Sequence, residues 1–222
     1  MEIALSKEDK PEILRYLEYR KHDIDENLDR QLDRCMDLIN KAARPKYISK
    51  VVDISNGIPK DCTFIKGFDI LKHLGGAKKM ILMAATLGPE VEFAIRKAQI
   101  RDVSDALIMD SCASTLVEVL CDSIEAEFRT EYEKEGLYLS TRYSPGYGDM
   151  PISVQREFTV YMDTVRRIGL NVSESGIMIP RKSVTAIIAI TKEKNSGLKR
   201  NCGTCNIREA CRFLRRGTTC GI

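Results

Sequence analysis

Four cysteines near the C-terminus have the residue type and spacing of a metal site in this 222-residue chain. Two, five and eight residues separate them, in the order Cys202, Cys205, Cys211 and Cys220. Four thiolates so close together suit a zinc ion or an iron–sulfur cluster. The first pair has chelate-loop spacing, whereas the longer gaps match no common ferredoxin or zinc-ribbon pattern. We predict a metal site at these cysteines; a disulfide, which a reducing compartment disfavours, and free thiols are the alternatives.

A second stretch with the composition of a binding loop is Thr141–Pro151, TRYSPGYGDMP. Arg142, Gly146, Tyr147 and Pro151 give it the spacing Arg-x3-Gly-Tyr-x3-Pro. An arginine can hold a carboxylate or phosphate through two parallel hydrogen bonds, while backbone groups approach a flat heterocycle. The ring of Tyr147 can pack on a ligand, and its hydroxyl can form a hydrogen bond. The alternative is an ordinary turn with a surface salt bridge.

The charge is unevenly distributed along the chain. The net charge is only +3, which argues against a generally basic nucleic-acid-binding protein. Residues 198–222 hold six basic residues and one acidic residue, so this tail carries +5 and residues 1–197 carry −2. The polar Asn195-Ser196-Gly197 segment is a natural hinge between them. We therefore predict two parts, a body of residues 1–197 and a basic four-cysteine tail of residues 198–222.

The body has the composition of a soluble globular protein. Hydrophobic residues make up 43% of the chain and charged residues 30%. The N-terminal residues lack the apolar core of a signal peptide, and the longest apolar runs are far below the roughly 18 residues of a membrane span. We expect a cytoplasmic protein without membrane contact. Two histidines, His22 and His73, leave little room for histidine-centred catalysis.

Apolar residues recur at spacings of three and four along most of the body, as expected of helices. The predicted helices begin near Pro11 and continue at Ile24–Ala42, Phe68–Leu74, Glu90–Gln99, Asp102–Lys134 and Ile152–Ile168. The stretch Asp102–Lys134 is either one long helix or a kinked pair. Cys35, Cys112 and Cys121 lie among apolar neighbours, and we expect core packing of them, as of Cys62.

Shorter β-rich stretches separate these helices. The predicted strands are Tyr47–Ile54, Cys62–Ile65, Lys78–Leu87, Gly176–Ile179 and Val184–Thr191. The expected fold class is therefore α+β, with long helices packed on a mainly antiparallel sheet and a small cysteine-rich C-terminal tail.

The loop and the segment after the last helix together resemble the activation domain of cobalamin-dependent methionine synthase. That family has an Arg–Gly–Tyr–Pro loop, a helix, and then a Thr/Ser-Glu-Ser segment followed by Met, Pro and Ser-Val-Ser. The matching residues of the later segment are Ser173-Glu174-Ser175, Met178, Pro180 and Ser183-Val184-Thr185. The resemblance covers roughly residues 110–191, and the combined pattern is much more specific than either part.

The resemblance implies binding of S-adenosylmethionine (AdoMet). Carried over by position, Arg142 would engage the AdoMet carboxylate. Ser144, where the family has Ala, and Gly146 would contribute backbone contacts to the ligand. Tyr147 would pack beside the ligand or hydrogen-bond to it. The helix segment LVEVLCDSI matches a Leu-Ala-Glu-Ala segment of the family, which places Glu118 at a ligand-binding carboxylate.

The match has one clear departure. The family has a Tyr-Phe pair in the strand after Ser-Val-Ser, and Ile188-Ala189 stand at those positions, so one aromatic AdoMet contact is absent. The chain also lacks the homocysteine, folate and cobalamin modules of a methionine synthase. The resemblance therefore implies a separate protein that supports reductive remethylation of a corrinoid on a methyltransferase partner, as a component of that reaction system.

The same resemblance bears on the metal at the tail cysteines. Reactivation of oxidised cobalamin requires an electron as well as a methyl group, which favours an Fe–S cluster over zinc by functional analogy. The tail arginines could dock an acidic partner or an electron donor, or form a solvated helix face. Two other functions fit parts of the sequence: an Fe–S redox activator of a corrinoid protein without AdoMet, and a zinc-stabilised binding module.

Anaerobic purification tests the tail prediction directly. We expect a brown protein with cluster absorbance and iron by metal analysis, because four thiolates would hold the cluster. Colourless protein containing zinc would favour the zinc alternative, and protein with neither metal would contradict a metal site at these cysteines.

Overall fold

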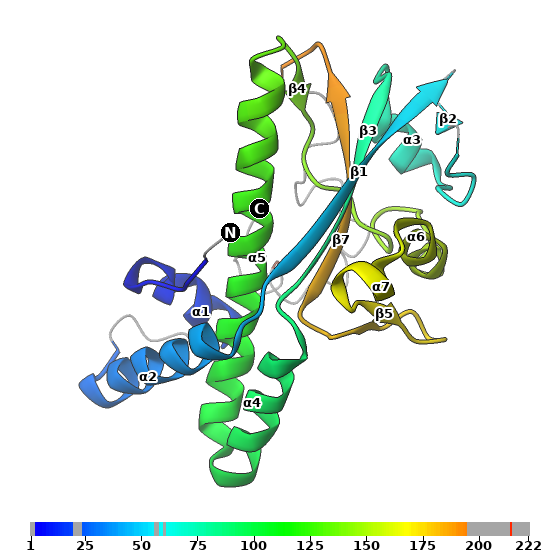
Figure 1. Cartoon of the computed structure of the whole chain (residues 1–222). Helices are drawn as coiled ribbons and strands as arrows, with labels where there is room; N and C mark the ends of the chain where they lie inside the picture. The colour runs from blue at the N-terminus through cyan, green and yellow to red at the C-terminus, as the bar shows by residue number, and fades with distance from the viewer. Residues whose placement is uncertain (1–2, 20–23, 56–57, 60, 195–213, 215–222) are drawn as a thin grey trace. The chain divides into compact units, whose positions relative to one another are not determined.

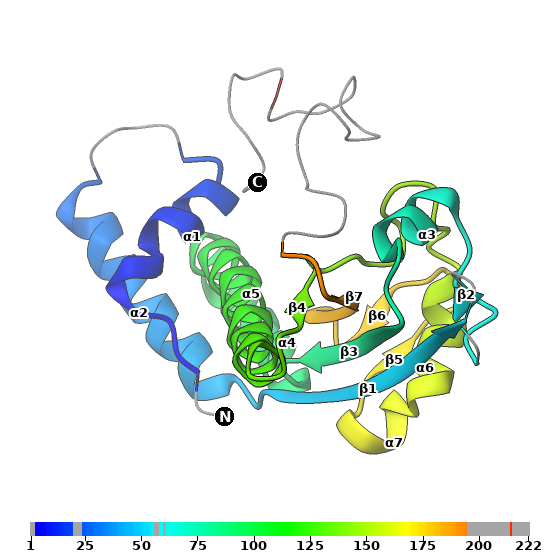
Figure 2. The ribbon, with the colours of Figure 1, turned by 90° about the horizontal axis from the view of Figure 1, so that it is seen from above.

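A computed structural model describes residues 3–19, 24–55, 58–59, 61–194 and 214 of the chain (Figure 1 and, turned by 90°, Figure 2). Its larger sheet has the strand order β2-β1-β3-β7-β4, and a second sheet pairs β5 with β6. The chain divides into two compact units that alternate along the sequence. The first contains the described residues up to Ile48, Ala84–Glu127 and Met162–Val184; the second contains Ser49–Met83, Phe128–Tyr161 and the described residues from Thr185 onward.

Helices α1 (Lys10–Tyr16) and α2 (Glu26–Ala42) belong to the first unit, after a short 3-10 helix, η1 (Lys7–Asp9). Asp25 caps α2 because its side chain accepts a hydrogen bond from the Leu28 amide at 2.8 Å. The predicted apolar stripe is the buried face of α2, with Leu32, Cys35, Met36 and Ile39 in the core. The ammonium of Lys10 joins the two helices through Asp29 and Asp33, at 2.6 and 2.7 Å.

Helices α4 (Pro89–Arg101) and α5 (Val103–Glu133) follow each other across a tight turn at Asp102 (Figure 1). The 31 residues of α5 form one continuous helix, which decides between the two alternatives that the sequence left open. Small and apolar side chains fill its buried face, as Cys112 and Cys121 illustrate. Burial raises the pKa of the Cys112 thiol to about 12, so this cysteine is a packing residue, as predicted.

The four body cysteines are all buried and unbridged, which confirms their predicted place in the core. Burial also raises the pKa of the Cys35 thiol to about 12. A thiol that stays protonated at neutral pH is a poor nucleophile and a poor metal ligand. The cysteines of the body therefore pack, and the predicted metal ligands Cys202, Cys205, Cys211 and Cys220 lie outside the described residues.

The strands are β1 (Lys46–Ser55), β2 (Ile58–Pro59), β3 (Lys79–Thr86), β4 (Tyr138–Leu139) and β7 (Ser183–Thr191). Residues of β3 and β7 are buried almost throughout, as their continuous apolar runs indicate. Strand β4 pairs antiparallel with β7, with Tyr138 opposite Thr191 and Leu139 opposite Ile190. Strands β1 and β2 are antiparallel as well, with Ile54 opposite Pro59. Long helices with a mainly antiparallel sheet confirm the expected α+β class.

The second unit has its own apolar cluster. Ile81, Leu139, Ile188 and Ile190 are its buried members, and Phe128, Tyr132 and Leu137 pack against them. The cluster therefore joins β3, β4 and β7 with the C-terminal turns of α5 and the connection to β4. This is the part of the fold from which the predicted binding loop extends.

Three predicted elements differ from the structure. Cys62–Ile65 is a turn rather than a strand, in which the Ile65 amide bonds the Cys62 carbonyl at 3.0 Å. The last body helix is broken into α6 (Val154–Met162) and α7 (Thr164–Ile168) because Asp163 is left-handed, with φ 53°. The strand predicted at Gly176–Ile179 is limited to β6 (Met178–Ile179), which pairs with the unpredicted β5 (Asn171–Val172).

Helix α3 (Phe68–Leu74) forms where the sequence predicted it and ends at Gly75. The structure places it in the second unit, beside the predicted binding loop. Across the part of the chain that the structure describes, no helix is long and apolar enough to span a membrane.

Two leucines of α5 test the core. Leu116 is fully buried and Leu107 is 61% exposed. We expect Leu116→Ala to lower the free energy of unfolding by about 2–5 kcal/mol, because it leaves a cavity in a packed core. The same substitution at Leu107 should change it by less than about 0.5 kcal/mol. Urea unfolding followed by circular dichroism measures both, and equal losses would contradict the placement of α5.

Candidate functional site

The predicted binding loop lies between β4 and α6, and its anchor is Tyr143. Tyr143 forms a β-bridge with Ile187 of β7, through Tyr143 N–H to Ile187 O at 2.9 Å and Ile187 N–H to Tyr143 O at 2.8 Å. This pairing continues the sheet for one residue beyond β4. Arg142 and Ser144 flank the bridge, so the backbone of both predicted ligand contacts is held against the sheet.

Beyond the bridge the loop folds back on itself. The Tyr147 amide bonds the Ser144 carbonyl at 3.0 Å, and the Gly146 amide bonds the Met150 carbonyl at 3.0 Å. The buried Tyr143 hydroxyl then donates to the Tyr147 carbonyl at 2.9 Å. The two tyrosine rings meet edge to face, with centroids 5.9 Å apart. The predicted ordered loop is confirmed, and Tyr143, which the sequence did not single out, organises it.

Two glycines are required where the loop turns. Gly146 has φ 90° and Gly148 has φ 54°, in the left-handed region that side chains disfavour. A Cβ on Gly148 would lie 2.2 Å from the Tyr143 hydroxyl and 2.6 Å from a carboxylate oxygen of Asp69. The backbone at Gly148 therefore packs directly on these two side chains, which explains the glycine at this position.

Asp149 ties the loop to helix α3. Its carboxylate accepts hydrogen bonds from the amides of Phe68, at 2.6 Å, and Asp69, at 3.0 Å. These are the first two amides of α3, and the N-cap residue Gly67 has no side chain to satisfy them. A carboxylate at a helix N-terminus also interacts favourably with the helix dipole. An aspartate some 80 positions along the chain thus caps α3 and fixes the far end of the loop.

The segment that leads into the loop is held by two side chains from other elements. Arg129 of α5 donates to the carbonyls of Leu139 and Ser140, at 3.0 and 3.2 Å. The buried His73 ring of α3 contacts the Thr141 carbonyl at 3.0 Å and the Ser140 hydroxyl at 2.9 Å through Nε2. Since the Thr141 carbonyl can only accept, a hydrogen bond to it requires the tautomer with a proton on Nε2. The backbone just before Arg142 is therefore fixed.

The electrostatics of the loop combine one guanidinium with nearby carboxylates. Arg142 is half-buried, with its Nη1 atom inside the protein. Burial, with Asp69 and Asp149 nearby, raises the pKa of the Tyr143 hydroxyl to about 12, so it remains a donor at neutral pH. Tyr147 is 41% exposed, and its ring is accessible at the surface of the loop. An anionic group and a flat ring are the ligand features that this pair can bind.

The other predicted residues belong to the first unit. Glu118 is half-buried on α5, and its charge contributes to the raised pKa of Tyr16, although burial is the larger cause. Ser173-Glu174-Ser175 form the turn between β5 and β6, where the Ser173 hydroxyl bonds the Ile177 amide at 3.0 Å. The structure brings Arg142, Ser144, Gly146 and Tyr147 together in one loop. A common ligand of that loop and Glu118 stays a prediction.

The two residues that replace the aromatic pair of the resembled family are buried. Ile188, which stands where the resembled family has a tyrosine, is fully buried in the apolar cluster of the second unit. Ala189 is also buried, and its amide bonds the Ser140 hydroxyl at 2.9 Å. Neither side chain can contact a ligand at the protein surface. The chain therefore has a core residue, Ile188, where the family pattern has an aromatic ligand contact.

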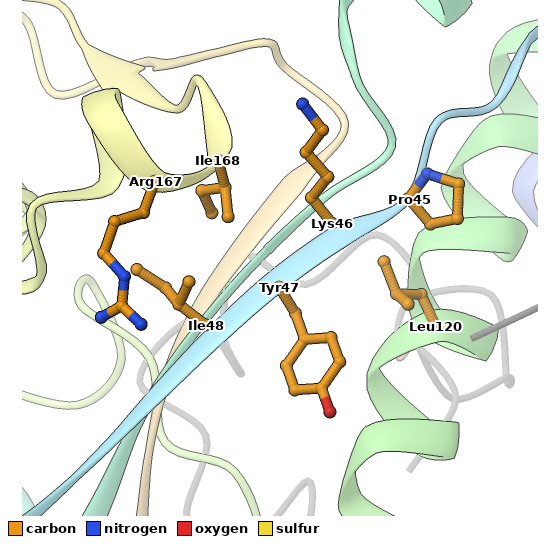
Figure 3. Close-up of a pocket in the computed structure, with 7 residues that line it drawn as sticks. All are labelled: Pro45, Lys46, Tyr47, Ile48, Leu120, Arg167 and Ile168. Atoms are coloured by element: carbon orange, nitrogen blue, oxygen red, sulfur yellow. The ribbon is translucent and has the colours of Figure 1, made fainter.

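A cavity of about 470 Å³ lies in the first unit, and none of the predicted site residues lines it (Figure 3). It is lined by Pro45, Lys46, Tyr47, Ile48, Leu120, Arg167 and Ile168. Within the described residues, no three His, Cys, Asp or Glu side chains are grouped so that they could hold a metal ion.

Sequence reasoning missed the residues that support the loop. Tyr143, Asp149, Arg129 and His73 hold its anchor, its far end and its entry. Tyr143 and Asp149 lie inside the Thr141–Pro151 segment, so their position in the sequence could have indicated a role in the loop. Arg129 and His73 come from distant segments, and only the tertiary structure brings them to the loop.

Two glycine substitutions separate backbone strain from the close packing at Gly148. Gly136→Ala should cost about 1–2 kcal/mol of stability, because Gly136 has φ 70° but open space around it. Gly148→Ala should cost a further ~1–3 kcal/mol, because the new methyl overpacks the Tyr143 hydroxyl and Asp69. Urea unfolding of the two variants measures the difference. Equal losses would show that the loop does not pack as described.

No family model and no curated protein matches this sequence. Among solved structures, the chain is similar to the crystal structure of the MetH reactivation domain bound to AdoHcy, with a TM-score of 0.58 and 14% sequence identity. The similarity covers 98% of this chain and 78% of that chain. At this identity the likeness shows the fold alone. The chain has the fold of the MetH reactivation domain, as its resemblance to a methionine synthase activation domain predicted.

Proposed function

We propose that this protein binds AdoMet and supports reductive remethylation of the corrinoid cofactor of a methyltransferase. The observation that carries the proposal is that the loop motif and the fold both point to the same kind of domain. The Arg–Gly–Tyr–Pro loop is ordered and anchored on a sheet, within a fold similar to a domain solved with AdoHcy. AdoHcy is AdoMet without the transferable methyl group, so a ligand of that shape is the natural candidate for this loop.

The loop has the chemistry to hold an amino-acid carboxylate and a flat ring. Arg142 would pair with the carboxylate, since a guanidinium offers two parallel donors to it. Tyr147 would pack beside the ligand with its exposed ring. Ser144 and Gly146 would present backbone groups, because their positions are fixed by the hydrogen bonds of the turn. Glu118 is proposed from the resemblance as the carboxylate that meets the ligand's polar groups.

The protein's contribution to the reaction would be positioning. Bound AdoMet supplies an electrophilic methyl group. The loop would hold the amino-acid end of the ligand, and a rigid anchor at Tyr143 keeps that geometry from relaxing. We propose that the corrinoid is carried by a separate methyltransferase, a methionine synthase being the first choice.

The division into a body of residues 1–197 and a tail of residues 198–222 is part of the proposal. The four tail cysteines would hold an Fe–S cluster, with zinc as the alternative, and the basic charge of the tail would attract an electron donor or an acidic partner. The tail lies outside the described residues, so this rests on cysteine spacing and charge.

One specific observation favours a second candidate function. Ile188 fills the core where the resembled family has an aromatic ligand contact, so one AdoMet contact is missing. A redox activator that reduces a corrinoid without using AdoMet would need no such contact. The two candidates differ in one measurable property, the affinity for AdoMet.

Calorimetric titration of AdoMet into the whole protein tests the proposal. We expect Arg142→Ala to weaken binding about 10- to 100-fold, because it removes a charge-assisted pair to the ligand. Arg142→Lys should lose about tenfold, since an ammonium keeps the charge but not the two parallel bonds. Arg156→Ala is the matched control, because Arg156 is an exposed arginine of α6 outside the motif.

The outcomes separate the candidates. Measurable AdoMet affinity that falls in both Arg142 variants and is unchanged in Arg156→Ala supports the proposal. Unchanged affinity in Arg142→Ala, with native circular dichroism, would overturn the site. A brown wild-type protein without AdoMet affinity would favour the redox activator.

A further inference from the structure

The cavity of the first unit is a second binding site candidate with its own chemistry. Three segments that are far apart in sequence line it: Pro45–Ile48 at the start of β1, Leu120 of α5, and Arg167–Ile168 of α7. Its volume of about 470 Å³ is in the range of small-molecule sites. Glu118 precedes Leu120 by two residues, about 200° around the helix, so it faces elsewhere.

The fold leaves this space open at a strand edge. Strand β1 pairs with β2 only at Ile54 and Ser55. Within the described residues no strand covers that edge at Lys46–Ile48. The first residues of β1 therefore form part of the cavity wall along an unpaired strand edge.

The wall formed by α7 is rigid. Gly169, with φ 74°, ends α7, and its amide N–H donates a hydrogen bond to the Val165 carbonyl at 3.1 Å. The Thr164 hydroxyl donates to the Leu170 carbonyl at 2.6 Å. These contacts fix the short helix at both ends, so the Arg167 and Ile168 side chains start from a defined backbone.

The lining combines apolar walls with positive charge. Ile48, Leu120 and Ile168 are buried and form the packed floor of the cavity, whereas Pro45 and Tyr47 are half-buried and offer apolar surface to a ligand. Lys46 and Arg167 are exposed and contribute two positive charges, while none of the lining residues is acidic. Tyr47 has its hydroxyl near the exposed Glu127 carboxylate, at 3.3 Å.

The two cations are free to meet a ligand. Among the described residues, neither the Lys46 ammonium nor the Arg167 guanidinium has a hydrogen-bond or ion-pair partner. Figure 3 shows their charged ends pointing in different directions, from β1 and from α7. By contrast the neighbouring Arg166 is paired with Asp163 at 2.6 Å.

We propose that this cavity binds a small organic anion, a molecule with an acidic group on an apolar or aromatic body. Pro45 and the Tyr47 ring would cover the apolar body above the packed floor, and this contact is the main source of affinity in such sites. Arg167 would attract the acidic group, and Lys46, whose charged end points in another direction, would add to the positive potential of the site, so that anions are favoured over neutral molecules of the same shape. None of its lining residues belongs to the Thr141–Pro151 loop.

Two dyes of nearly the same shape test the proposal on the whole protein. The anionic dye 8-anilinonaphthalene-1-sulfonate and its uncharged analogue N-phenyl-1-naphthylamine differ by the acidic group. We expect Arg167→Gln to weaken binding of the anionic dye about three- to tenfold, and the double variant with Lys46→Gln to weaken it further. Binding of the uncharged dye should be the same in all variants.

Arg166→Gln is the matched control. It removes the same charge one residue away, from a side chain that does not line the cavity. Because both variants carry equal net charge, attraction of the dye to basic residues elsewhere in the chain is equal in the two. Anionic-dye affinity that falls in Arg167→Gln alone supports the site. An equal fall in Arg166→Gln, or an equal fall for the uncharged dye, would overturn it.

Discussion

The backbone pairing of Tyr143 with Ile187 is the constraint on which the proposed binding loop depends. Two hydrogen bonds, at 2.9 and 2.8 Å, extend the sheet by one residue and stop the chain from leaving it at β4. From this anchor the Tyr143 hydroxyl reaches the Tyr147 carbonyl, and Gly148 packs against that same hydroxyl. Asp149 then attaches the far end to α3. One tyrosine thus positions the flanking Arg142 and sets where Tyr147 can lie.

The departure at Ile188 has a structural consequence for any AdoMet site. An aromatic side chain there would have to enter the cluster that Ile81, Leu139 and Ile190 already fill. The core of the second unit therefore excludes a ring at this position without repacking. Ligand binding in this chain would depend more strongly on the loop itself, and above all on Arg142. This is why the arginine is the residue whose substitution is most informative.

Much of the fold could be predicted because helices with a clear apolar stripe report their buried face directly. The stripe Leu32, Cys35, Met36 and Ile39 placed α2, and the buried run of β3 placed a central strand. The break at Asp163 was not predictable, since a left-handed aspartate leaves the apolar spacing unchanged. Cys62–Ile65 is β-rich in composition yet turns, because tertiary packing overrides local preference in short segments. Local pattern also located the loop, but not Arg129 and His73, which approach it from distant elements.

The proposed binding site for an AdoMet-like ligand is the loop Thr141–Pro151. Amide hydrogen exchange with and without AdoHcy, followed by peptide mass analysis, measures this segment directly. The loop is already ordered by backbone hydrogen bonds at Tyr143, Gly146 and Tyr147. We predict that AdoHcy slows exchange further in peptides that cover residues 141–151. Saturating AdoHcy that leaves exchange in these peptides unchanged would contradict a ligand site at this loop.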